Sequence, residues 1–383
     1  MRLCLHGYVV AVGNQAGTTS QGIYSVAVGV LAGTSSQSSY SVAVGSFAGQ
    51  TSQGANSVAV GVNAGNNTQG SHTVALGNGA GKTNQKDFGI AIGYDAGQNT
   101  QSTNAIAIGA NAGLTTQGEK SVAIGYEAGK ESQGVYSVAL GLYSGQQSQG
   151  SQAIAIGYQA GYADQKRFGI AIGAGAGQAG QSTNAIAIGQ SAGLTLQGEN
   201  SISIGQDAGN STQGTQAVAI GYGAGQYNQG ANSVALGAGT AASYTNSTAI
   251  GYQAATTGDN TIQLGNSSVT SVNTSAGVNA KSYYLNSSNS VTAASTTTID
   301  LSTNNIFKVS LGADISTLTL NNAKPGTYII EFIQGAAYNV TFPSAWRWAS
   351  SIIPNITPTA NKIDIVTLVY DGSTYFASAV QNF

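Results

Sequence analysis

Few side chains in this sequence could carry out acid–base or nucleophilic chemistry. The two histidines, His6 and His72, have no acidic residue at a matching position in the neighbouring repeats described below, as a Ser–His–Asp arrangement would need. Asp95, Glu127 and Asp207 occupy one position of their repeats, but two or more repeats separate them, so neighbouring carboxylates lie about 10 Å or more apart. That exceeds the roughly 5 Å of a retaining glycosidase and only reaches the inverting range. We therefore expect no enzyme, and a polysaccharide-degrading spike is the less favoured alternative.

The glycine-rich motif GAGQAG over residues 175–180 does not predict a nucleotide site. A phosphate-binding loop opens a helix and is followed about 20 residues later by an acidic residue. Here the next repeat, QSTNAIAIG, follows instead. The single cysteine, Cys4, excludes intramolecular disulfides and cysteine-based metal clusters. We expect neither a cofactor nor a bound metal.

Tyrosines at two recurring positions are the candidate surface-contact residues. A tyrosine offers a large rigid face and a hydroxyl at low entropic cost, so a column of them could stack sugar rings or protein partners. The alternative is that the rings shield the edges of the fold or pack between chains. One group directly follows a repeated glycine and the other stands two residues before a repeated aliphatic position; they are Tyr94, Tyr126, Tyr158, Tyr222 and Tyr252, and Tyr24, Tyr40 and Tyr136.

The elements that carry these side chains are short repeats of constant length. A glycine closes each VAVG-like or AIAIG-like motif at a spacing of 16 from Gly13 to Gly237, and two intervals of 14 lead to Gly251 and Gly265. A fixed short period of this kind indicates a solenoid. The alternation aliphatic, small, aliphatic predicts a short strand in each repeat. We expect the aliphatic face of the strand to be buried in the core and the alanine face to lie flat against another copy.

A glutamine stands eight residues after the repeated glycine in every repeat that can show it. We expect these residues to form a structural ladder of stacked amides rather than a binding stripe. The ladder comprises Gln21, Gln37, Gln53, Gln69, Gln85, Gln101, Gln117, Gln133, Gln149, Gln165, Gln181, Gln197, Gln213 and Gln229.

The composition excludes several partners. Charged residues make up only 7% of the chain and the formal net charge is -2, so no electrostatic footprint for nucleic acid or an anionic membrane is present. No stretch approaches the 18 or so apolar residues of a membrane-spanning helix. The segment 85–125 returns at 165–205, a whole number of repeats later, which indicates internal duplication and a tolerance of length that suits a fibre.

The motifs NSVAVG (56–61), NAIAIG (104–109 and 184–189) and NSVALG (232–237) resemble the YadA-like head repeat of trimeric autotransporter adhesins. The resemblance implies a left-handed parallel β-roll and a homotrimer. The passage 248–275 is similar to the one that leaves such a roll in phage tail fibres, and the ending ANKIDIVTLVYDGSTYFASAVQNF resembles a C-terminal domain of phage tail fibres.

These features together predict an all-β protein. We expect a solenoid over 1–265, a Ser/Thr/Asn-rich connector over 266–297 and a small antiparallel β-sandwich over 298–383, whose alternating strands are separated by turn residues. The expected function is that of a non-enzymatic phage or viral fibre at the virion or extracellular surface, bound to host glycan or protein. The alternative is a bacterial surface adhesin or a head-to-tail filament. We also expect the unpaired edge of the first repeat to dock onto another protein or another copy.

Overall fold

The computed structural model describes residues 3–4, 8–269 and 289–383 and divides the chain into two compact units, residues 1–273 and 274–383. His6 and most of the expected connector, residues 270–288, lie outside the described part. No helix among the described residues is long and apolar enough to cross a membrane.

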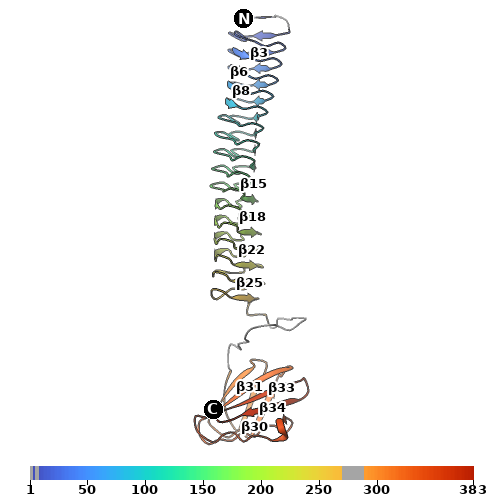
Figure 1. Cartoon of the computed structure of the whole chain (residues 1–383), viewed down its shortest axis with the longest axis vertical. Helices are drawn as coiled ribbons and strands as arrows, with labels where there is room; N and C mark the ends of the chain where they lie inside the picture. The colour runs from blue at the N-terminus through green and yellow to red at the C-terminus, as the bar shows by residue number, and fades with distance from the viewer. Residues whose placement is uncertain (1–2, 5–7, 270–288) are drawn as a thin grey trace. The chain divides into compact units, whose positions relative to one another are not determined.

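The first unit is a parallel β-solenoid, as the repeats predict (Figure 1). Each coil contributes one three-residue strand to a long sheet, and equivalent residues of consecutive coils pair directly, for example Ala91 with Ala107. After β24 the pairing follows the shorter period, as between Ala235 and Ala249. The strands of this sheet are β1 (Leu3–Cys4), β2 (Val10–Val12), β3 (Val26–Val28), β5 (Val42–Val44), β7 (Val58–Val60), β9 (Val74–Leu76), β11 (Ile90–Ile92), β12 (Ile106–Ile108), β13 (Val122–Ile124), β14 (Val138–Leu140), β15 (Ile154–Ile156), β16 (Ile170–Ile172), β18 (Ile186–Ile188), β20 (Ile202–Ile204), β22 (Val218–Ile220), β24 (Val234–Leu236), β25 (Thr248–Ile250) and β26 (Ile262–Leu264).

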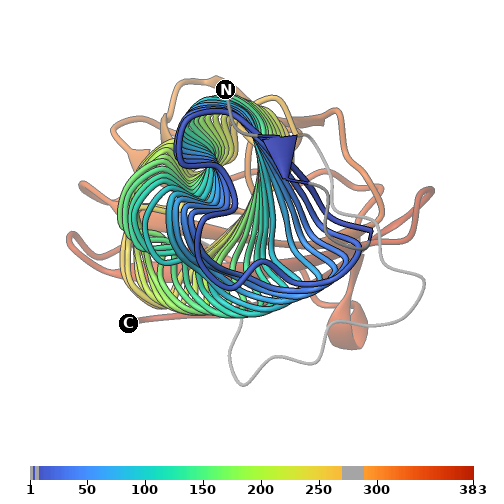
Figure 2. The ribbon, with the colours of Figure 1, turned by 90° about the horizontal axis from the view of Figure 1, so that it is seen from above.

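A second row of short parallel strands ends at the glutamines and forms the other side of the coils. Its two sheets are joined by isolated bridges such as Gln117 to Gln133, so the row continues between them. Figure 2 shows the coils stacked on one another with a gradual rotation along the unit. The strands are β4 (Ser35–Gln37), β6 (Thr51–Gln53), β8 (Asn67–Gln69) and β10 (Thr83–Gln85), then β17 (Ala179–Gln181), β19 (Thr195–Gln197), β21 (Ser211–Gln213) and β23 (Tyr227–Gln229).

The expectation about the buried face was wrong. In most strands of this sheet the central residue is an alanine that points into the coil and is fully buried, as at Ala107 and Ala123, together with the alanine of the bend, as at Ala112. The exceptions are Ser203 in β20, which is also buried, and Gln263 in β26, which is half-buried. The flanking valines and isoleucines point outward and are half-buried or exposed. The inside of the coil has little room for larger side chains at these positions, because a Cβ on Gly113 would already lie 2.9 Å from Gln117 Oε1 and 3.4 Å from the Ala107 Cβ.

The strand β1 pairs antiparallel with β2, with Cys4 opposite Ala11. The edge of β2 in the first coil is therefore covered by β1 rather than open as we expected, and docking of this end onto another protein or copy stays a prediction.

The second unit is a two-layered β-domain. Its larger sheet has the order β27 (Asn289–Thr292), β29 (Ile306–Leu311), β31 (Gly326–Gln334), β33 (Ile363–Tyr370), β34 (Tyr375–Val380), β32 (Arg347–Trp348), and its smaller sheet pairs β28 (Thr296–Asp300) with β30 (Thr317–Asn321). A short 3-10 helix, η1 (Ala349–Ser351), follows β32. The core between the layers includes the fully buried Phe307, Ile330, Phe332 and Leu368.

The strand directions in this unit differ from a purely antiparallel sandwich. β27, β29 and β31 are parallel neighbours, and so are β28 and β30, whereas β31, β33 and β34 are antiparallel. The chain thus starts this unit with wider solenoid-like coils and ends it with antiparallel strands. β27 and the start of β28 fall within the expected connector. Val340 forms only an isolated bridge, to Ile315.

Candidate binding surface

The glutamines lie between the two sheets of the solenoid and are tied to their own coils. All except Gln21 are buried. Each Nε2 donates to the backbone carbonyl eleven residues earlier, as from Gln165 to Ile154 at 2.8 Å. The amide therefore joins the end of one strand row to the start of the other across the interior.

Eight neighbouring glutamine pairs are also hydrogen-bonded to each other, at 2.9–3.2 Å. Where the ladder is interrupted between Gln197 and Gln213, Ser203 bridges the gap, because its hydroxyl donates to Gln213 Oε1 at 2.8 Å and lies 3.4 Å from Gln197 Nε2. Ser203 stands where every other 16-residue coil has alanine, so this departure in the sequence serves the ladder. The buried glutamines are inaccessible to a ligand.

The tyrosines two residues before a strand stack on their equivalents in neighbouring coils. Tyr8, Tyr24 and Tyr40 form one stack, with ring centroids 4.9 and 5.1 Å apart. Further along, Lys120 lies over the ring of Tyr136 at 5.3 Å. Tyr24, Tyr40 and Tyr136 all have φ near +60°, a backbone conformation that bulky residues seldom adopt. Because ring faces in the stack cover one another, mainly ring edges remain for a partner.

The tyrosines that follow a repeated glycine are exposed to a similar extent, but they do not stand in consecutive coils. Tyr94, Tyr126, Tyr158, Tyr222 and Tyr252 are 57%, 45%, 50%, 63% and 64% exposed. A smaller residue usually stands in the coil between two of them, as Ala110 does between Tyr94 and Tyr126. Their ring faces are therefore not covered by a direct neighbour of the same column, which makes this column the better candidate for stacking a ligand.

One part of this column is a tyrosine cluster that the sequence analysis did not single out. Tyr143 contacts Tyr126 and Tyr158 edge-on, at 5.5 and 6.4 Å between centroids. A hydrogen bond to the Glu127 carboxylate raises the pKa of the Tyr126 phenol above its ordinary value. The hydroxyl accordingly stays protonated and neutral at physiological pH.

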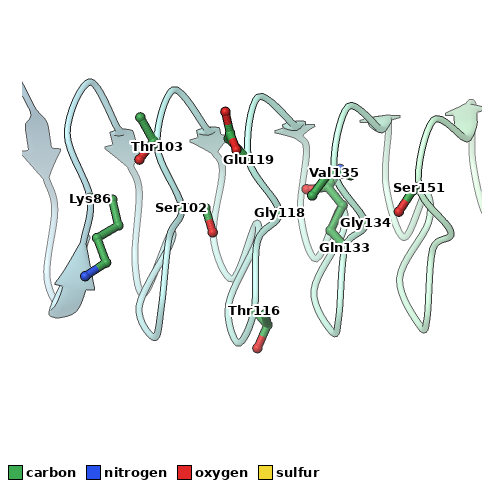
Figure 3. A pocket seen from close by; sticks show the side chains of 10 residues that line it. All are labelled: Lys86, Ser102, Thr103, Thr116, Gly118, Glu119, Gln133, Gly134, Val135 and Ser151. Carbon is green, nitrogen blue, oxygen red and sulfur yellow. The ribbon is translucent and has the colours of Figure 1, made fainter.

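A shallow groove of about 640 Å³ runs across several coils on another side of the solenoid. Its floor includes Gly118 and Gly134, where coils approach so closely that a Cβ would lie 2.5 Å from backbone atoms of the next coil. Figure 3 shows the lining side chains on successive coils, with Lys86 at one end and Ser151 at the other and Thr116 set apart from Glu119. Glu119 is the one carboxylate that lines this groove, and Lys120 pairs with it at 3.0 Å.

Those residues considered for catalysis that the structure describes do not come together. His72 stacks on Phe88 at 5.1 Å, and its Nε2 lies 3.4 Å from the Asn56 amide nitrogen. Glu127 pairs with Lys130 at 3.1 Å, and Asp207 accepts a hydrogen bond from Asn210 at 3.2 Å. Within the described ranges, no three His, Cys, Asp or Glu residues are grouped so as to hold a metal ion. The arrangement offers stacking and hydrogen bonding to a ligand.

The second unit has an aromatic cluster that sequence reasoning missed. Phe342 contacts Trp346 and Trp348 at 5.7 and 4.9 Å, and Trp346 contacts Tyr375 at 6.0 Å. Both tryptophans of the chain line a hollow of about 540 Å³ together with Arg347. The alternating strands around them indicate a buried core, but the clustering depends on the path of residues 342–346 and of the two-residue strand β32, which carries no periodic signal.

Comparisons with known families match both units. The family model "YadA head domain repeat (2 copies)" matches residues 101–128, 197–224, 229–254 and 245–268. The model "Putative phage tail fibre C-terminal domain" matches residues 291–375. No curated protein sequence matches the chain. The resemblance seen in the sequence is confirmed: the chain combines YadA-like head repeats in its solenoid with a C-terminal domain similar to that of phage tail fibres.

Proposed function

We propose that the chain is a non-enzymatic phage fibre that attaches the particle to a host surface. The match of residues 291–375 to the phage tail-fibre model carries the proposal, and both family matches support a protein of the fibre or adhesin kind. The geometry supports the proposal in two ways. The stacked coils and the internal glutamine ladder suit an elongated solenoid, and its surface carries few charges and many tyrosines. On this proposal the protein acts at the virion or extracellular surface and its partner is a host glycan or protein.

We further propose that the fibre is a homotrimer in which copies meet through the outward aliphatic face of the long sheet. Strand after strand places two valine, isoleucine or leucine side chains on this face, as Ile170 and Ile172 in β16. Leu76 and Leu140 are 44% and 42% exposed in the isolated chain. A continuous apolar face of this length is typical of a surface that another chain covers.

Analytical ultracentrifugation of the full chain and two variants tests the interface. The pair Ile156→Glu/Ile172→Glu places charges on the aliphatic face of adjacent coils, and we expect it to dissociate the trimer because an interface would have to bury those carboxylates. Leu196→Glu is the matched control, since Leu196 is 63% exposed on the other strand row, in β19. A monomeric parent protein at micromolar concentration, or a trimeric double variant, would contradict the interface.

Attachment itself is tested with the labelled full-length protein and a panel of bacterial strains in flow cytometry. We expect saturable binding to some strains, competed by unlabelled protein, and no binding to the others. Incubation of the protein with surface polysaccharide from a bound strain should release no shorter saccharides. Uniform, non-saturable adsorption to every strain would argue against a receptor-binding fibre, and release of oligosaccharides would favour a depolymerase.

A further inference from the structure

A notch lies on the solenoid where one coil has lost its larger outward side chains. It has a volume of about 250 Å³, and Ala174 and Gly175 lie between Tyr158 of the preceding coil and Gln190 of the following coil. Because coils repeat about every 4.8 Å, these walls are about 10 Å apart, which leaves room for one ring about 5 Å from each wall. Half of the Tyr158 surface is exposed, so its ring is accessible.

The internal duplication shows that the fold does not require this notch. Tyr94 and Asp95 of the first copy stand where the second copy has Ala174 and Gly175. A Cβ on Gly175 would approach only the end of the Leu194 side chain, at 3.3 Å, and Ser191 Oγ, at 3.8 Å. Asp95 adopts a similar backbone conformation, with a φ of 50° against 66° at Gly175. Side chains are thus compatible with this coil, and their loss opens a space rather than relieving a clash.

The polar groups around the notch are neutral amides. Gln178 Nε2 donates to Gln159 Oε1 at 2.9 Å, which holds the two side chains together. In the described part of the chain, Gln159 Nε2 and Gln178 Oε1 have no hydrogen-bond partner of their own. The notch therefore offers a fixed donor and a fixed acceptor beside the tyrosine ring, and no charged residue lines it.

We infer that this notch binds one neutral sugar residue of a longer saccharide. A sugar ring has an apolar C–H face that stacks on Tyr158 and hydroxyls that pair with the Gln159 and Gln178 amides. A charged ligand would find no ion-pair partner, and a purely apolar ring would leave the amides unpaired. The volume is below the roughly 300–1,000 Å³ of pockets that enclose a whole small molecule, which suits a single residue whose chain continues into solvent. The inference rests on the proposed attachment function, because it names the class of receptor.

The test uses the full-length protein and a panel of D-glucose, D-galactose, D-mannose, L-rhamnose and N-acetyl-D-glucosamine with oligosaccharides built from them, plus sialic acid as a charged comparison. Binding is measured by saturation-transfer NMR and calorimetry. We expect at least one neutral saccharide to bind and sialic acid not to bind. Ala174→Tyr/Gly175→Asp, which installs the residues of the first copy, should abolish binding, and Tyr158→Ala should weaken it about tenfold.

The matched control is Ser46→Tyr/Phe47→Asp, which places the same residue pair in the same columns of a coil far from the notch. It should leave saccharide binding unchanged, and circular dichroism should show equal melting of all variants. Failure of every neutral saccharide to bind, or undiminished binding by the filled variant, would overturn the inference. If strain-specific cell binding persists in Ala174→Tyr/Gly175→Asp, the notch is not the receptor site, but the proposed fibre function stands. If the parent protein binds a saccharide but no cells, the notch stands as a saccharide site and the proposed attachment function fails.

Discussion

The glutamine ladder should contribute unequally to local stability along the solenoid. Gln165→Leu tests this at a position where the side chain is hydrogen-bonded to both neighbouring glutamines. Gln165 Nε2 lies within hydrogen-bond distance of the Ile154 carbonyl, the Gly169 carbonyl and Gln181 Oε1, at 2.8, 3.1 and 2.9 Å, and its Oε1 accepts from Gln149 at 3.1 Å. Leucine has a similar volume but restores none of these bonds. It also leaves Gln181 Oε1 buried without its donor.

The expected cost is the loss of two or three net hydrogen bonds of about 1 kcal/mol each, together with about 1–3 kcal/mol for the stranded acceptor. Leucine regains part of this through apolar burial, so we expect about 2–4 kcal/mol of local destabilisation. Gln53→Leu is the matched control, because Gln53 Nε2 donates to the Val42 carbonyl at 2.8 Å while its Oε1 is already buried without a partner. Its replacement should cost about 0–1 kcal/mol.

Amide hydrogen exchange with mass spectrometry is the suitable assay, because a solenoid opens coil by coil rather than as one two-state unit. The peptides around residues 149–181 should exchange about 30-fold or more faster in Gln165→Leu, the equivalent of at least 2 kcal/mol. The coils around Gln53 should change by less than about tenfold in Gln53→Leu. Equal effects at the two positions would refute the reasoning that hydrogen bonds between coils add to the bond within each coil.

Three further outcomes are expected. Gly161→Ala should destabilise the solenoid by about 1–3 kcal/mol more than Gly223→Ala in denaturant titrations. Both glycines have φ between 50° and 60°, so the backbone strain of the two substitutions is similar. A Cβ at Gly161 would lie 2.7 Å from Gln165 Oε1, whereas one at Gly223 meets nothing closer than 3.8 Å. Asp364→Ala should lower the unfolding free energy of the second unit by about 2–4 kcal/mol, because the buried carboxylate accepts hydrogen bonds from Thr357 Oγ1 and the Asn382 backbone amide, both at 2.8 Å. Near-UV circular dichroism follows this transition, and an unchanged midpoint would contradict the prediction. Backbone hydrogen bonds from Thr374 and Ser373 lower the pKa of Asp371 below its ordinary 3.8. The carboxylate therefore stabilises the folded unit fully above pH 3.8, and this contribution is lost as the pH falls through the pKa of the folded state. In Asp371→Asn the melting temperature should accordingly fall less steeply at acid pH than in the parent protein.

Much of the architecture follows from periodicity alone. Glycines at a spacing of 16 place equivalent residues of consecutive coils side by side, so the parallel pairing of Ala91 with Ala107 and the column of buried glutamines could be expected before any coordinates. The all-β class and the β-domain at the end of the chain follow from alternation within each strand in the same way, because side chains of a strand alternate between its two faces.

Alternation does not say which face is inside when neither face is polar. Aliphatic residues flank an alanine in β13, and only the limited space inside the coil decides that Ala123 is enclosed and Val122 faces outward. Parallel pairing of β27 with β29 likewise depends on contacts between segments distant in sequence. The notch at Ala174 is visible in the sequence only as two small residues; it becomes a cavity because stacking puts Tyr158 and Gln190 on either side of them at a fixed distance. Spacing in the sequence determines which residues become neighbours. The space inside the coil and the side chains of the adjacent coils determine which of these residues a ligand can reach.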